Sequence, residues 1–148
     1  MSVNYKCVLF CEDIRQEVGG RISLMGILGT KLYVQDFPLI FPKLCLFIEW
    51  GEVKENLNVT LNIIPPEGVQ MNNVHPSATI GAQQGVVSRS MIVLTNFAFP
   101  KAGQYVFEFV VNGEVVNREI FAVEKYEVVI GLEVHAQLKT KSKIFAPS

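Results

Sequence analysis

The chain has 148 residues, of which 49% are hydrophobic and 18% are charged. This length suits one ordinary domain that buries roughly 70% of its unfolded surface, and the apolar composition excludes an intrinsically disordered protein. Thirteen basic and 14 acidic residues give a net charge of -1, whereas a nucleic-acid-binding domain usually carries a basic patch. We therefore expect that the main domain binds no nucleic acid.

The apolar runs of the sequence are short. The run nearest the N-terminus covers only residues 7–11 before Glu12 and Asp13 end it, which is too short for the core of a signal peptide. The longest runs elsewhere, such as residues 44–48 and 128–132, fall far short of the ~20 residues that cross a bilayer. These lengths predict a soluble, cytoplasmic protein that does not contact a membrane.

The sequence contains three cysteines, an odd number. Cys7 and Cys11 would lie about 13 Å apart along one extended strand, beyond the reach of a disulfide. Cys45 is distant from both in the sequence, and His75 and His135 occupy unrelated contexts, so the pattern lacks the spacing of a metal site. We expect all three thiols to be reduced and buried.

In the first half of the chain, apolar residues recur with period 2 or in short continuous runs, a pattern typical of β-strands. The Gly19-Gly20 turn predicts a hairpin between the first two strands. Pro38 and Pro42 are expected to lie in a crossing loop, because proline cannot donate to a central ladder. The predicted strands of this half cover residues 5–12, 21–28, 31–34 and 43–50.

The second half shows the same periodicity. Residues 56–64 alternate cleanly and are predicted to place Leu57, Val59, Leu61 and Ile63 on one face, after which residues 65–68 form a turn. The uncharged stretch of residues 68–88 is expected to be a loop or an irregular strand. A strand follows over residues 86–99, and the clearest hairpin joins residues 105–111 to 115–123 through Asn112-Gly113, which suits a type I′ turn.

Seven or eight short strands separated by turns predict an all-β fold, an antiparallel β-sandwich. Two details favour an immunoglobulin-like arrangement over a barrel. The sequence around Tyr105 has the pattern of a tyrosine corner at the start of a late strand, and Trp50 ends a central strand from which it can pack across the two sheets. The alternative is that both are simply large core residues.

Few residues of the predicted sandwich suggest chemistry. Glu12, Asp13, Arg15 and Glu17 form a charged cluster just after the first predicted strand. A binding edge is one interpretation of this cluster, and a solvated connection is the simpler one.

His75 lies near Ser77 and Ser88 in the uncharged stretch, but neither a G-x-S-x-G motif nor a nearby acid accompanies them. No glycine-rich phosphate loop is present either. We therefore predict no catalytic or cofactor-binding residues in the sandwich. Loops at the end of a sandwich often bind another protein or a small ligand. The loop of residues 69–85 is the first candidate for such a binding site, and its partner is not identified by the sequence.

Most of the chain resembles a known family. The segments LFCEDIRQE (residues 9–17) and GGRISLMGI (residues 19–27), Phe41-Pro42 before an apolar strand, and GQY (residues 103–105) before NGE (residues 112–114) resemble a family of small bacterial β-sandwich proteins of unknown function. The resemblance covers about residues 3–124. It implies a β-sandwich domain over residues 1–124 and a bacterial origin, and it implies no activity.

The C-terminal segment resembles a different protein. Residues 125–145, KYEVVIGLEVHAQLKTKSKIF, are similar to the start of the ATP-using subunit of the aspartyl/glutamyl-tRNA amidotransferase, which activates the misacylated glutamate or aspartate on tRNA. The resemblance implies that Glu133 and His135 help to hold magnesium, and residues i and i+2 of a strand do share a face. One strand cannot complete an ATP site, so residues 125–148 are expected to be an incomplete fragment.

Several origins of this C-terminal segment stay open. It is a truncated fusion or a reading-frame artefact, a peptide that docks on the amidotransferase or mimics it, or a coincidence. Structurally, residues 126–134 are strongly β-prone, so they are expected to extend the edge of the sandwich or to pair with another copy in a homo-oligomer.

Taken together, these patterns predict a non-catalytic binding or scaffold module without a cofactor. The alternative is a truncated amidotransferase fusion that is inactive as it stands, and magnesium and ATP would belong only to that reading.

Overall fold

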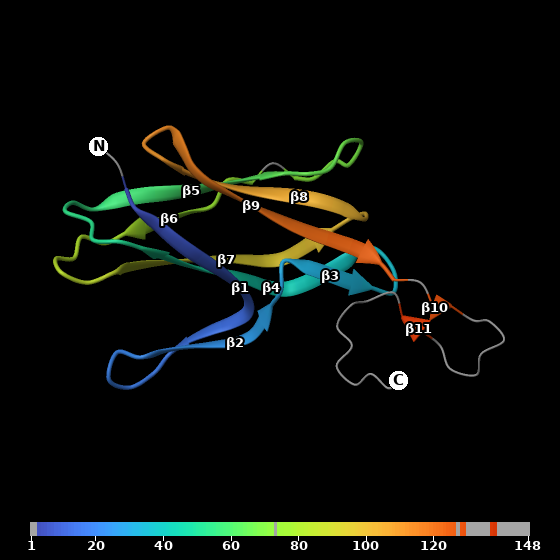
Figure 1. The fold of residues 1–148 in the computed structure, drawn as a ribbon, viewed down its shortest axis with the longest axis horizontal. Coiled ribbons are helices and arrows are strands. Elements are labelled where there is room, and N and C mark those ends of the chain that lie inside the picture. The colour runs from blue at the N-terminus through green and yellow to red at the C-terminus, as the bar shows by residue number, and fades with distance from the viewer. Residues whose placement is uncertain (1–2, 73, 127, 130–136, 139–148) are drawn as a thin grey trace.

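The computed structural model describes residues 3–72, 74–126, 128–129 and 137–138. Two β-sheets pack face to face over one hydrophobic core (Figure 1), which confirms the predicted all-β sandwich. No helix that could cross a membrane is found in the described part of the chain. The strands of the sandwich are β1 (Tyr5–Gln16), β2 (Ile22–Leu28), β3 (Lys31–Val34), β4 (Leu39–Trp50), β5 (Leu57–Ile64), β6 (Ser77–Ile80), β7 (Ser88–Phe99), β8 (Gly103–Val111) and β9 (Glu114–Lys125).

One sheet has four strands in the order β2-β1-β4-β7, with every neighbour antiparallel. Its longest ladder joins β4 to β7, from the pair Leu39–Phe99 to the pair Trp50–Ser88. Side chains of β4 are buried almost continuously from Leu44 to Trp50. Because neighbouring side chains of a strand point to opposite faces, this strand is covered on both faces.

The other sheet has five strands in the order β3-β9-β8-β5-β6. All its neighbours are antiparallel except β3, which runs parallel to β9 along one edge. Asn112 and Gly113, between β8 and β9, have φ angles of 54° and 76°. Two consecutive positive φ angles are what a type I′ turn requires, so the predicted hairpin is confirmed. The short strand β6 lies within the uncharged stretch, and it brings the sandwich to nine strands.

The core is built from aromatic rings that meet across the two sheets. Phe121 of β9 stacks on Phe99 of β7 with ring centroids 5.2 Å apart, and it also contacts Phe10 of β1 and Phe107 of β8. All four rings are at most 1% exposed. Full burial of one such side chain stabilises the fold by about 1.5–3 kcal/mol.

Both aromatic residues singled out in the sequence have specific polar contacts in addition to their packing. The Tyr105 hydroxyl donates to the carbonyl oxygen of Lys101 at 2.6 Å, as in a tyrosine corner. Trp50 is fully buried, and its indole N–H donates to the Ser90 hydroxyl at 3.1 Å.

Three expectations were wrong. Strand β1 continues past Glu12 to Gln16, because β2 supplies a partner up to the pair Gln16–Ile22. Pro42 lies inside β4 and not in a loop. It is tolerated there because β1 pairs with β4 only as far as Cys45, which leaves one side of β4 without a ladder at Pro42. Cys7 is exposed, whereas Cys11, four residues further along the same face of β1, is buried.

Beyond β9, Val128–Val129 (β10) pairs with Gln137–Leu138 (β11) in a separate two-stranded sheet. Within the β-prone segment, Tyr126 donates its N–H to the carbonyl oxygen of Val34 in β3, the edge strand of the five-stranded sheet, at 3.0 Å. Val128 and Val129 pair within the same chain. Glu133 and His135, the predicted magnesium ligands, lie outside the described residues.

Candidate functional site

The second half of β1 leaves the sheet together with β2. The ladder between β1 and β4 ends at the pair Cys11–Cys45, whereas the ladder between β1 and β2 continues to the pair Gln16–Ile22. We call residues 12–26 the arm. It projects from the sandwich as a two-stranded hairpin (Figure 1).

The arm begins at a kink. The ladder between β1 and β2 lacks the rung between Glu12 and Gly26, and Gly26 has a φ of 68°. A Cβ atom at Gly26 would lie 2.6 Å from Oε1 of Glu12. Glycine is therefore required at this position both for its backbone angle and for the space that Glu12 fills.

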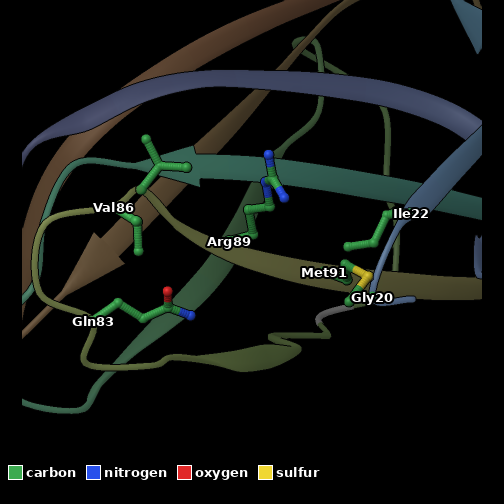
Figure 2. Close-up of a pocket in the computed structure, with 7 residues that line it drawn as sticks. Gly20, Ile22, Gln83, Val86, Arg89 and Met91 are labelled. Atoms are coloured by element: carbon green, nitrogen blue, oxygen red, sulfur yellow. The ribbon is translucent and has the colours of Figure 1, made fainter. Parts of the chain in front are cut away.

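A groove lies between the arm and the start of β7 (Figure 2). Strands β2 and β7 form opposite edges of their four-stranded sheet, so in a flat sheet they would be roughly 14 Å apart. The arm must therefore curl back across the outer face of the sheet. The groove has a volume of about 650 Å³ and is lined by Gly20 and Ile22 from the arm and by Gln83, Val86, Val87, Arg89 and Met91.

The wall opposite the arm is held by neighbouring loops. The backbone N–H of Gln83 donates to the carbonyl oxygen of Val53 at 3.0 Å, and the N–H of Gly85 donates to Oε2 of Glu52 at 3.2 Å. Ser88 adds a bond from its hydroxyl to the carbonyl oxygen of Gly81 at 2.7 Å. These bonds fix both ends of the turn that carries Val86 and Val87.

Among the described residues that line the groove, Arg89 is the charged one. Its Nε donates to Oε2 of Glu49 at 3.1 Å, and its guanidinium lies 5.8 Å from the ring centroid of Phe47. Because that bond uses Nε, the two terminal nitrogens keep their capacity to donate to a ligand. The groove thus combines apolar walls with a charged donor and the amide of Gln83.

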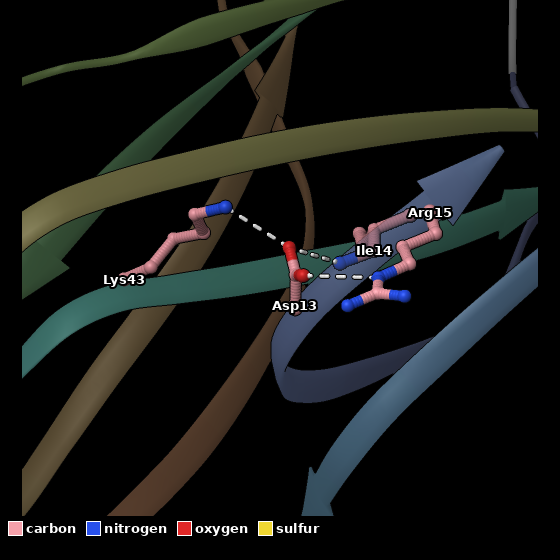
Figure 3. Close-up of polar contacts among 4 residues, drawn as sticks. All are labelled: Asp13, Ile14, Arg15 and Lys43. Carbon is pink, nitrogen blue, oxygen red and sulfur yellow. Dashed lines mark hydrogen bonds and ion pairs between the residues drawn. The ribbon is translucent and has the colours of Figure 1, made fainter.

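One ion pair joins the base of the arm to β4, and a second lies within the arm (Figure 3). Asp13 accepts a hydrogen bond from Nζ of Lys43 at 2.9 Å, and its other oxygen lies 3.6 Å from Nε of Arg15. The hydrogen bond from Lys43 holds the pKa of the Asp13 carboxyl below its ordinary value, and the pKa of Lys43 is raised for the same reason. Asp13 and Arg15 of the predicted charged cluster therefore meet at the arm, together with Lys43, which the sequence did not single out.

The other candidates from the sequence are dispersed. His75 is exposed in the loop before β6, Ser77 begins β6, and the hydroxyl of Ser88 is bonded to a backbone carbonyl. Among the described residues of the predicted binding loop, 69–72 and 74–85, Gln83 alone lines the groove. The sequence feature that could have indicated the wall opposite the arm is the apolar pair Val86-Val87 at the end of the uncharged stretch.

No cluster of three or more histidine, cysteine, aspartate or glutamate side chains that could hold a metal ion occurs in the part of the chain that the structure describes. A metal site at Glu133 and His135 lies outside that part.

Comparison with known proteins places most of the chain in one group. The model of DUF6941, a family of unknown function, matches residues 6–124, which span β1 to β9 almost completely. No curated protein and no solved structure matches the chain. Because the family model covers well over half of the sequence, the chain belongs to the DUF6941 family.

Proposed function

We propose that this protein is a non-catalytic binding module whose ligand occupies the groove between the arm and β7. The observation that carries the proposal is the groove itself: its volume of about 650 Å³ falls within the ~300–1,000 Å³ of small-molecule sites. Its walls come from segments distant in the sequence, and hydrogen bonds and ion pairs hold them in place.

The side chains that line the groove support binding over catalysis. Catalysis at a site of this kind requires a base, an acid or a nucleophile near the reacting atom. The Arg89 guanidinium can only donate hydrogen bonds, and the Gln83 amide is neither an acid nor a base. The remaining lining residues are apolar side chains or glycine.

The same side chains define the ligand class. Ile22, Val86, Val87 and Met91 favour an apolar body. Arg89 and the Gln83 amide supply donors at the groove wall, so the ligand should carry a hydrogen-bond acceptor, such as a carboxylate or a carboxamide. We therefore propose a small molecule with an apolar chain and an accepting end group.

Titration of the full chain, followed by amide NMR shifts, tests this proposal. The probes are hexanoate and hexanamide, which carry acceptors, and hexylamine, whose ammonium only donates. Hexanoate and hexanamide should shift the amides of the arm tip and of residues 83–91, and hexylamine should shift them much less.

A matched pair of variants localises the binding. Val87 and Val115 are 36% and 37% exposed, and only Val87 lines the groove. Val87→Trp fills the groove and should weaken hexanoate binding at least tenfold, whereas Val115→Trp should leave it unchanged. Equal binding by both variants, or shifts scattered over the surface, would contradict the proposal.

We also infer that the scaffold is immunoglobulin-like. Strands β4 and β7 in one sheet and β9, β8 and β5 in the other correspond to strands B and E and strands G, F and C of that fold. The bond from Tyr105 at the start of β8 supports the same assignment. The free cysteines of the described chain support a reducing compartment, the cytoplasm.

A second candidate function concerns the C-terminal segment, because the family match ends at residue 124. The alternative proposal is a fusion with the start of the ATP-using amidotransferase subunit, and it rests on the sequence of residues 125–145. Magnesium binding by the full chain that disappears in the Glu133→Ala variant would favour this reading. Identical magnesium titrations of the two chains would oppose it.

A further inference from the structure

Two thiols lie directly opposite each other where the arm leaves the sheet. Cys11 of β1 and Cys45 of β4 are cross-strand partners, and they form the last rung of the ladder between these strands. Both are free, and they are 0% and 1% exposed. No local pattern in the sequence indicates this pair, because 33 residues separate the two cysteines.

The geometry of this rung matches that of a disulfide. Opposite residues of an antiparallel pair have Cα atoms about 4.5 or 5.5 Å apart, depending on the type of rung, and disulfides span about 4.4–6.8 Å. Their side chains point to the same face of the sheet. Cross-strand Cβ atoms are about 4.5–5.5 Å apart, against about 3.5–4.5 Å in a disulfide, so closure requires a shift of roughly 1 Å.

We propose that Cys11 and Cys45 are a reversible dithiol–disulfide pair that is oxidised by a small-molecule disulfide such as oxidised glutathione. This inference concerns the two thiols alone and does not depend on the proposed ligand groove.

The reaction balances as a thiol–disulfide exchange in two steps. The Cys45 thiolate attacks one sulfur of the small disulfide, forms a mixed disulfide and releases one small thiolate. The Cys11 thiolate then attacks the Cys45 sulfur, which closes the bond between the two Sγ atoms and releases the second small thiolate. The two protons of the cysteines end on the two released thiolates, and the small disulfide is reduced.

The surroundings of the pair slow its oxidation while the arm is packed against β4. Burial raises the pKa of Cys11 to about 11, and burial also raises the pKa of Cys45, although the charge of Lys43 opposes this shift. A protonated, buried thiol exchanges slowly. Oxidation therefore needs the arm to separate from β4, and the kink at Gly26 and the surface ion pairs of Asp13 lie at that point.

The disulfide would lock the base of the arm to the sheet. The arm carries Gly20 and Ile22, which form one wall of the groove. A covalent bond at the last rung removes the opening motion at this hinge, so the redox state of the pair would set how rigidly that wall is held.

The test removes the exposed thiol of Cys7, and it lets glutathione reach Cys11 and Cys45 before the fold buries them. The full chain with Cys7→Ser is refolded from urea in a buffer of oxidised and reduced glutathione, and free thiols are then blocked with N-ethylmaleimide. Trypsin releases peptides of residues 7–15 and 44–54, each with one cysteine. More than half of the chains should give these two peptides joined, with the loss of two hydrogens.

Control variants and a thermal readout complete the experiment. Cys11→Ser on the same background should leave Cys45 blocked by maleimide or carrying glutathione. The oxidised chain should melt about 10 °C above the chain treated with dithiothreitol, because the bond closes a long loop. The proposal would be overturned if the chain refolds and both cysteines are recovered as maleimide adducts or as mixed disulfides with glutathione.

Discussion

Ser90 offers a sharp test of the polar network inside the sandwich. The hydroxyl of this buried residue of β7 accepts the indole N–H of Trp50 at 3.1 Å and donates to the carbonyl oxygen of Thr79 at 2.9 Å. One oxygen atom thus connects β4 and β7 of one sheet to β6 of the other. Ser90→Ala removes that atom and leaves the packing almost unchanged.

The expected loss follows from the groups that the variant leaves behind. A buried donor without a partner costs about 1–3 kcal/mol, and a lost neutral hydrogen bond costs about 0.5–1.5 kcal/mol. Trp50 is fully buried, whereas Thr79 is an exposed residue, so the indole N–H is the group that the variant leaves buried without a partner. We therefore expect Ser90→Ala to destabilise the fold by about 3 kcal/mol. With an unfolding entropy of about 2.1 cal/mol/K per residue, Tm should fall by ~12 °C for a domain of this size.

Ser88→Ala is the matched control. Ser88 is equally buried in the same strand, but its hydroxyl makes a single bond, to the half-buried Gly81. Its loss should cost about 1 kcal/mol, or ~4 °C in Tm. Thermal and urea unfolding followed by the fluorescence of Trp50, the chain's one tryptophan, measures both variants. Equal Tm values for the two variants would refute the reasoning, because they would show that the indole N–H does not depend on Ser90.

Three further outcomes are expected. Asn62 and Arg118 donate hydrogen bonds to Glu108 and hold the pKa of its carboxyl below the ordinary value. The ionised carboxylate of Glu108 therefore stabilises the fold fully above the ordinary pKa, and this stabilisation is lost as the pH falls through the lowered pKa. The stability gap between the native chain and Glu108→Gln should therefore narrow between about pH 7 and about pH 3 in urea titrations, and a constant gap would contradict this. Phe121→Ala should cost about 3–5 kcal/mol in the same assay, because the ring packs against three other phenylalanines. A chain that ends after Tyr126 should melt within a few degrees of the full chain, and a drop above ~10 °C would show that the C-terminal segment is an integral part of the sandwich.

The strands themselves were largely predictable from local patterns. The alternation in residues 56–64 matches β5, and the Asn112-Gly113 turn falls where both φ angles are positive. Such signals are local, because period-2 burial and turn chemistry depend on residues that are neighbours in the sequence. Pro42 misled the prediction because the rule against proline depends on whether a neighbouring strand is present, and here β1 has already ended its ladder.

The candidate site was much less predictable. Its walls join residues 20–22 to residues 83–91, and nothing in either segment indicates the other. The charged cluster at Glu12–Glu17 is visible in the sequence, but its ion-pair partner Lys43 comes from β4. The same holds for the thiols, since the separation of Cys7 and Cys11 follows from their spacing along one strand, whereas the contact of Cys11 with Cys45 depends on strand register.

The sequence by itself determined an apolar-rich chain and an all-β fold, because periodicity, turn residues and composition are properties of consecutive residues. Tertiary structure alone decided how the arm curls over the sheet, which residues form the groove and which two cysteines meet. Those features follow from the register and the order of the strands, which bring together segments that are distant in the sequence. The local sequence of one such segment does not indicate which other segment it contacts.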